Sequence, residues 1–259
     1  MELIDTHCHL TFEQLAGSVD AVLQRSIEAG VSSWITVGID LNENKKVLAL
    51  SEKYANLYAA VGIHPHEAAK TQDADMENLK QSAKHHKVVA IGETGLDYHY
   101  DFSPPIDQAR IFKAQLQIAA DLNLPVIIHS REAFDDTLKI LNDYRSSLKK
   151  VVFHCFSYSP EQAKILLDYG CFLSFTGVVT FKGAETTRLS AKSTPPERLM
   201  IETDCPYMTP APMRKQKINE PAFLVHTAKF IAELKQVPLE DFASAAASAT
   251  RSFFNLTKK

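Results

Sequence analysis

The feature that most constrains the fold of this chain is a regular alternation of short apolar runs with longer amphipathic stretches. The short runs are rich in β-branched residues, and this alternation is typical of parallel strands that are each followed by a helix. Eight strands are predicted, at residues 2–5, 33–37, 57–61, 88–91, 125–128, 151–153, 171–174 and 198–201. A chain of 259 residues has room for eight such repeats, so we predict an α/β fold of the TIM-type (β/α)8 barrel class.

Several residues indicate where the predicted helices begin and end. Ser103 and Ser159 each precede a proline and are predicted N-caps, whereas Gly30 and Gly170 are predicted to end helices. Two C-terminal helices are predicted, at residues 222–235 and 239–254. No linker, low-complexity tract or recognisable repeat interrupts this order, so we predict a single domain over residues 1–259.

Composition excludes some classes of protein but leaves the substrate open. A net charge of -3 gives no overall attraction for nucleic acid, so contact with a polyanion would depend on local basic residues or bound metal. The sequence has neither a basic leader at its start nor a run of about 20 apolar residues. Four cysteines without a CxxC pair are expected to stay reduced. We therefore predict a cytoplasmic protein with no membrane segment, and we infer no obligatory protein partner.

Histidines and acids gather just after the C-terminal ends of the predicted strands. In a (β/α)8 barrel these ends meet on one face, where catalytic residues lie. The candidates are His7 and His9 after the first strand, Glu93 after the fourth, His129 after the fifth, His154 after the sixth and Asp204 after the eighth. Imidazole and carboxylate groups are ligands for divalent cations. We predict that these six residues hold two divalent metal cations in one active site.

The closest spacing among these candidates is the HxH pair. Alternation in an extended segment directs His7 and His9 to the same side, where both imidazoles can hold one metal. An isolated HxH is more often an ordinary hydrogen-bonded pair, but the other ligand-bearing strand ends favour a metal site. The alternatives for the other candidates are a salt bridge for Glu93, satisfied core histidines for His129 and His154, and an N-cap for Asp204.

Further predictions concern catalysis and substrate binding. Asp204 is predicted to receive a proton and Glu93 to bridge metals, so both are candidate catalytic groups. His64, after the third strand, is a third catalytic candidate, although the proline that follows it also fits a loop-shaping role. His66 is a weaker candidate than His64 for contact with the substrate. Arg131 is predicted to bind phosphate oxygens of the substrate.

Six segments together resemble the TatD family of metal-dependent deoxyribonucleases, a branch of the amidohydrolase-like barrels. They are IDTHCHL at residues 4–10, VGIHPH at 61–66, AIGETGLDY at 90–98, IHSR at 128–131, FHCFS at 153–157 and IETDCPY at 201–207. The resemblance runs the full length of the chain. It implies that one metal is held by His7, His9, Glu93 and Asp204, and the second by Glu93, His129 and His154. It also implies hydrolysis of phosphodiester bonds in DNA.

The predicted metals favour an anionic substrate without requiring one. Two dications, two carboxylates and a hydroxide leave the site with a net positive charge that would attract a phosphodiester. Four imidazoles suit zinc or manganese better than magnesium, the metal often described for the family. We therefore predict a hydrolase of DNA or another phosphodiester. A barrel hydrolase of a small amide, lactone or phosphoester metabolite is the alternative, and a non-catalytic metal-binding protein is disfavoured.

Overall fold

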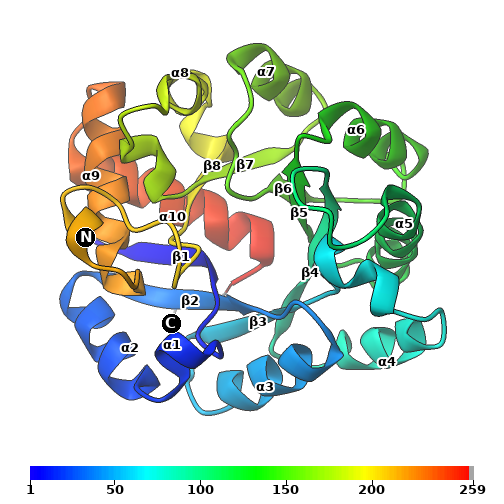
Figure 1. Cartoon of the computed structure of the whole chain (residues 1–259). Helices are drawn as coiled ribbons and strands as arrows, with labels where there is room; N and C mark the ends of the chain where they lie inside the picture. Colours follow the sequence, from blue (N-terminus) through cyan, green and yellow to red (C-terminus); the bar gives the residue numbers. More distant parts are fainter. Residues whose placement is uncertain (257–259) are drawn as a thin grey trace. The chain divides into compact units, whose positions relative to one another are not determined.

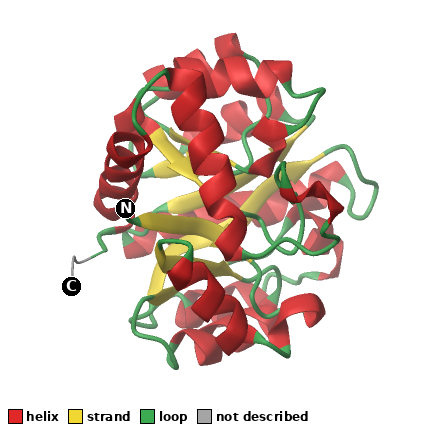
Figure 2. Ribbon diagram, turned by 90° about the vertical axis from the view of Figure 1, so that its left-hand side faces the viewer, coloured by secondary structure: helices red, strands yellow, loops and turns green. Residues whose placement is uncertain are grey.

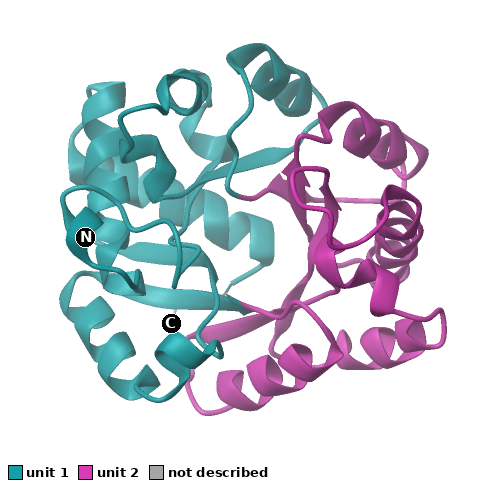
Figure 3. Ribbon diagram, viewed as in Figure 1, with its two compact units in different colours: residues 1–36, 155–259 teal, residues 37–154 magenta. Residues whose placement is uncertain are grey.

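The computed structural model describes residues 1–256, and they fall into two compact units (Figure 3). Unit 1 comprises residues 1–36 and the chain from residue 155 onward, and unit 2 comprises residues 37–154. Eight strands follow one another in sequence order, and each is followed by at least one helix (Figure 1). This repeat confirms the predicted (β/α)8 barrel class. A single domain over residues 1–259 stays a prediction.

Unit 1 contains strands from both ends of the chain. Its strands are β1 (Leu3–Cys8), β2 (Val31–Val37) up to Thr36, β7 (Phe172–Phe175) and β8 (Leu199–Ile201). Strand β1 pairs in parallel with β2, and β7 with β8, while Cys8 forms a parallel bridge with Cys205 just beyond β8. The order within the unit is therefore β7, β8, β1, β2. Its helices are α1 (Glu13–Ala16), α2 (Val19–Glu28), α7 (Pro160–Asp168), α8 (Glu185–Ser193), α9 (Leu224–Lys235) and α10 (Leu239–Phe254), with 3-10 turns η2 (Gly177–Thr180), η3 (Pro196–Arg198), η4 (Met213–Lys215) and η5 (Pro221–Phe223).

Unit 2 is a continuous stretch of chain with four consecutive parallel strands. The strands are β3 (Leu57–Val61), β4 (Val88–Asp97), β5 (Val126–Arg131) and β6 (Val151–Phe153), and each pairs with the next. The helices are α3 (Leu41–Ser51), η1 (Pro65–Lys70), α4 (Asp75–Ser82), α5 (Pro105–Leu122) and α6 (Phe134–Asp143). Figure 2 shows the strands in yellow and the helices in red, with loops in green between them.

Three strands run further than predicted and include candidate ligands. Strands β3 and β6 have the predicted bounds, but β1, β4 and β5 continue through His7, Glu93 and His129. These residues therefore lie within strands, and their predicted position just after the strand ends is wrong. The reason is that backbone pairing outlasts the apolar run, since Gly95 still pairs with His129 after a register shift between Ile91 and Thr94.

Most of the predicted helix ends are confirmed. Ser159 caps α7 in a capping box with Gln162, and Gly30 and Gly170 follow α2 and α7 with positive φ angles. Helix α10 has the predicted bounds, and α9 begins two residues later than predicted. Within residues 1–256, every helix falls short of the combined length and hydropathy that a membrane crossing requires.

Ser103 is not the N-cap of α5, so this prediction is wrong. Pro104 stands at the cap position, and the helix begins at Pro105. The Ser103 hydroxyl instead donates to the His66 carbonyl at 2.8 Å and accepts the Ala69 N–H at 3.1 Å. The hydroxyl therefore stabilises the turn η1 that follows β3.

Two buried glutamines of α5 hold the backbone at the ends of β3 and β4. Gln115 accepts the Ile63 N–H at 2.8 Å and donates to the Ile63 carbonyl at 2.9 Å. Gln108 does the same for Asp97, at 2.8 and 2.9 Å. Both side chains are almost fully buried, where an unpaired amide would be costly. These hydrogen bonds fix the backbone beside His64 and at Asp97.

Substitution of Gly95 by alanine tests the close pairing of β4 with β5. Gly95 has a φ of +141°, and an added Cβ would lie 1.9 Å from the His129 carbonyl oxygen. We expect Gly95→Ala to lower the free energy of unfolding by roughly 3 kcal/mol or more, measured by urea denaturation. Gly183→Ala is the control, because an added Cβ there meets nothing within 4 Å. Equal unfolding midpoints for the two variants would contradict this account.

Candidate functional site

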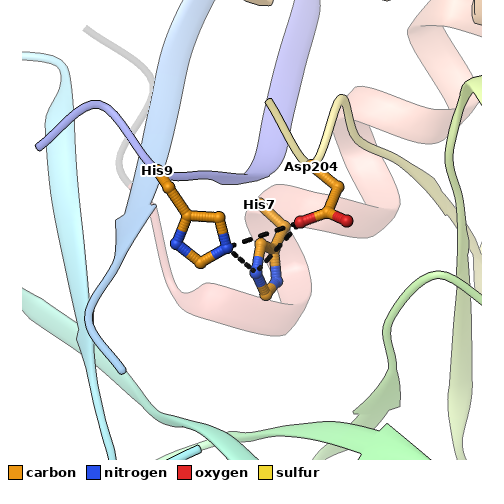
Figure 4. Close-up of side chains that lie close together, drawn as sticks. All are labelled: His7, His9 and Asp204. Carbon is orange, nitrogen blue, oxygen red and sulfur yellow. Dashed lines mark hydrogen bonds and ion pairs between the residues drawn. The ribbon is translucent and has the colours of Figure 1, made fainter. Parts of the chain in front are cut away.

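Unit 1 brings three of the predicted ligands together. His7 Nε2 lies 3.2 Å from His9 Nε2, and Asp204 Oδ1 lies 3.4 Å from His9 Nε2 and 3.8 Å from His7 Nε2 (Figure 4). All three residues are buried. Two imidazole nitrogens and a carboxylate oxygen thus point at a common centre, an arrangement that could hold a divalent cation.

Backbone hydrogen bonds fix this cluster, which we call the unit 1 cluster. The Asp204 N–H donates to the His7 carbonyl at 2.9 Å, and the His9 N–H donates to the Cys205 carbonyl at 2.9 Å. Asp204 has a φ of +53°, a left-handed conformation that aspartate tolerates better than most residues. The Asp204 carboxylate faces the two histidines, so the N-cap alternative does not describe its position.

Two buried acids beside the unit 1 cluster had no predicted role. Asp5 accepts both the Thr203 N–H at 2.9 Å and the Thr203 hydroxyl at 2.6 Å, and burial raises the pKa of Asp5 to about 7 against these hydrogen bonds. Glu202 accepts the Cys155 N–H at 2.6 Å. Asp5 therefore fixes the backbone next to Asp204, and Glu202 ties the end of β8 to the backbone of Cys155. In the sequence, both acids could have been noticed because each lies inside or directly after an apolar strand.

Unit 2 surrounds one carboxylate oxygen with three imidazoles. Glu93 Oε1 lies 2.7 Å from His154 Nε2, 2.8 Å from His129 Nδ1 and 3.6 Å from His64 Nε2. Glu93 is 3% exposed, and a carboxylate so buried requires partners. We call these four residues the unit 2 cluster. Glu93, His129 and His64 could hold a divalent cation, and His154 lies within contact distance of the same oxygen.

Asp97 supports the unit 2 cluster, and sequence analysis missed it. Its Oδ2 lies 2.8 Å from His129 Nε2 and 3.1 Å from His66 Nε2. Burial disfavours the charged form, but hydrogen bonds with both histidines outweigh it and hold the pKa of Asp97 below its ordinary value. Asp97 follows Glu93 by four residues in β4, and this spacing places both side chains on one face. That spacing could have identified Asp97.

His129 therefore lies between two carboxylates. Burial favours its neutral ring, but hydrogen bonds to Asp97 and Glu93 outweigh burial and raise the pKa of His129. A carboxylate on the outer nitrogen of a metal-binding histidine fixes its tautomer and orientation. In this arrangement Asp97 holds Nε2, and Nδ1 points to Glu93 and to the space that a cation would occupy.

His64 shapes the turn that follows β3, and its ring also faces Glu93, while its catalytic role stays a prediction. Its Nδ1 accepts the His66 N–H at 3.1 Å and so caps the turn η1, while its Nε2 faces Glu93. Burial lowers the pKa of His64 well below its ordinary value, although the charge of Glu93 opposes this. Because Nδ1 is occupied by the His66 N–H, Nε2 is the ring nitrogen available to a cation or a substrate. His66 contacts Asp97 and has a supporting position.

Arg131 lies outside the unit 2 cluster. It ends β5, two residues after His129, and its guanidinium lies 4.9 Å from the centre of the Tyr100 ring. Its role in phosphate binding stays a prediction. The joint assembly of the six predicted ligands into one site also stays a prediction.

Parallel strands that carry histidines and acids at their C-terminal ends, within a (β/α)8 fold, define the class of metal-dependent barrel hydrolases. The comparison with protein families agrees. Residues 4–255 match the family model described as TatD related DNase, and the chain belongs to this family of metal-dependent hydrolases.

Similar proteins cover nearly the whole chain. The uncharacterized metal-dependent hydrolase YabD of Bacillus subtilis is 39% identical over 254 residues, which cover 98% of this chain and 99% of YabD. The 3'-5' ssDNA/RNA exonuclease TatD of Salmonella typhimurium is 36% identical over 235 residues, which cover 89% of this chain and 90% of that protein. The crystal structure of YJJV, a TatD homologue from Escherichia coli, matches with a TM-score of 0.93 and 34% identity, covering 98% of each chain.

The supporting role of Asp97 is testable by cation binding. We expect Asp97→Asn to weaken binding of Mn²⁺ or Zn²⁺ by roughly ten- to a hundredfold, because the amide cannot hold His129 as the carboxylate does. Competition with a chelating dye measures the affinity. Asp101→Asn is the control, since Asp101 is an exposed acid four residues further along the chain. Unchanged affinity in Asp97→Asn would contradict the supporting role.

Proposed function

We propose that this chain hydrolyses phosphodiester bonds in single-stranded DNA or RNA, with two divalent cations per chain. The observation that carries the proposal is the set of three imidazoles around the buried Glu93 oxygen. The names of the Salmonella and Erwinia relatives, 3'-5' ssDNA/RNA exonuclease, support this substrate class. A cytoplasmic location also stays a prediction.

The donor atoms of both clusters fit divalent cations. Within each ligand set the nitrogen and oxygen atoms lie within 4.8 Å of one another, and metal bonds of about 2.0–2.2 Å fit such a spacing. The excess of imidazole nitrogen over carboxylate oxygen favours zinc or manganese over magnesium. We propose one cation at the unit 1 cluster and one at the unit 2 cluster. The proposal includes the predicted bridging of the two cations by Glu93.

When bound, the two cations would supply a water of lowered pKa and neutralise negative charge on the scissile phosphate. The side chains perform the remaining tasks in the proposal. Asp204 accepts the proton that the attacking water loses. We assign the unit 2 cation to Glu93, His129 and His154. His64, whose Nδ1 accepts the His66 N–H, then donates a hydrogen bond from Nε2 to a phosphate oxygen, and Arg131 binds a neighbouring phosphate through its fork of N–H groups.

Metal content tests the assignment of one cation to each cluster. We expect wild-type protein, stripped with chelator and reloaded, to bind about two equivalents of Mn²⁺ or Zn²⁺. His9→Ala and His154→Ala should each retain about one equivalent, because each removes a ligand from a different cluster. Elemental analysis after dialysis gives the number. Two retained equivalents in either variant would contradict the assignment, and His226→Ala, outside both clusters, is the control.

A product-resolved assay tests the proposed activity. We expect metal-loaded protein to cleave end-labelled single-stranded DNA or RNA, and Glu93→Gln to lower the rate at least about a hundredfold by removing a charged ligand. Glu132→Gln is the matched control, because Glu132 is a 63% exposed acid that pairs with His99. Failure to cleave any oligonucleotide, with turnover of a small amide, lactone or phosphoester, would favour the alternative hydrolase.

A further inference from the structure

Two aromatic side chains are exposed in the segment between β4 and α5. The side chain of Phe102 is 62% exposed and that of Tyr100 is 43% exposed. Their rings lie nearly parallel, with centroids 5.4 Å apart and an interplanar angle of 26°. Exposed apolar rings lose the gain that burial would give, so a paired set on the surface indicates a binding surface. We call Tyr100 and Phe102 the aromatic platform.

The aromatic platform adjoins the unit 2 cluster through His66. The His66 ring meets Phe102 edge-on with centroids 4.8 Å apart, and Tyr100 with centroids 5.5 Å apart. His66 Nε2 lies 3.1 Å from Asp97, which holds His129. The Asp97 carboxylate also accepts the backbone N–H of Tyr100 at 3.1 Å. One buried acid therefore positions both the candidate cation ligand His129 and the backbone of the platform.

A cation accompanies the aromatic platform. The Arg131 guanidinium lies 4.9 Å from the centre of the Tyr100 ring, and Arg131 stands two residues after His129 in the sequence. Flat aromatic faces next to a guanidinium match the two repeating parts of a single-stranded nucleic acid, its unpaired bases and its phosphates. A duplex does not fit equally well, because its bases already stack on one another and present only their edges.

We propose that Phe102, the more exposed ring and the one backed by the stacked Tyr100 ring, stacks on an unpaired base next to the scissile phosphodiester, while Arg131, which lies over Tyr100, binds an adjacent phosphate. This inference rests on the proposed function and specifies how the substrate is selected. Stacking tolerates any base, because every base has an aromatic face. The platform therefore selects for single strands without selecting for sequence.

The experiment compares two oligonucleotides that differ only in their bases. Metal-loaded protein is titrated with short phosphorothioate-linked DNA that carries 2-aminopurine, and with the same backbone carrying abasic spacers. We expect wild-type protein to bind the base-bearing strand at least about tenfold more tightly and to quench 2-aminopurine fluorescence. In the Tyr100→Ala, Phe102→Ala double variant the ratio of the two affinities should fall to within about twofold.

Further variants separate stacking from charge and from misfolding. Arg131→Ala should weaken binding of both strands by a similar factor and reduce the salt dependence of binding, as removal of a phosphate contact does. Phe102→Tyr keeps an aromatic face and should keep the preference. Ile165→Ala is the control, because it removes a 44% exposed apolar side chain of α7. Unchanged metal content shows that each variant keeps its clusters.

The outcomes distinguish the platform from the proposed function. Equal wild-type affinity for the two strands, or a preference that survives in the double variant, would overturn the platform while leaving cleavage untouched. Binding is measured without turnover. A protein that prefers base-bearing strands but cleaves no oligonucleotide would overturn the proposed hydrolysis and leave the aromatic platform supported as a binding surface.

Discussion

The contact on which unit 2 depends is that of His129 with two buried carboxylates. Glu93 lies at one ring nitrogen and Asp97 at the other, both at 2.8 Å. A buried carboxylate without partners would destabilise the fold, and a buried imidazole between two acids satisfies both at once. These contacts orient the ring nitrogens of His129 and the carboxylate oxygens toward one another.

Each cluster depends on backbone features that the identity of its ligands does not reveal. In unit 2, a glycine at position 95 lets β4 approach β5 at the level of His129. In unit 1, residues 7–9 and 203–205 exchange backbone hydrogen bonds, and the buried Asp5 holds Thr203. The histidines and acids are therefore fixed by the pairing of strands that lie far apart in sequence.

The repeat of strands and helices could be predicted because apolar periodicity reports burial directly. The candidate ligands could be predicted because acids and imidazoles stand out at the ends of apolar runs. Strand ends were less predictable, since pairing continues past the apolar residues into Glu93 and His129. Asp97 could have been found from its spacing of four residues after Glu93 in β4, although its contact with His66 could not. Phe102 was missed because its position depends on a side-chain contact with His66, which no single stretch of sequence encodes.

The paired amide hydrogen bonds of Gln108 and Gln115 have a consequence for how the chain can vary. These side chains stand seven residues apart, two turns along α5, and each pairs with the backbone N–H and carbonyl of one residue, Ile63 just after β3 or Asp97 at the end of β4. Glutamate lacks the donor, and leucine lacks both groups. An outer helix usually tolerates exchange of one apolar residue for another. At these two positions of α5, however, the backbone groups that the side chains pair with require an amide.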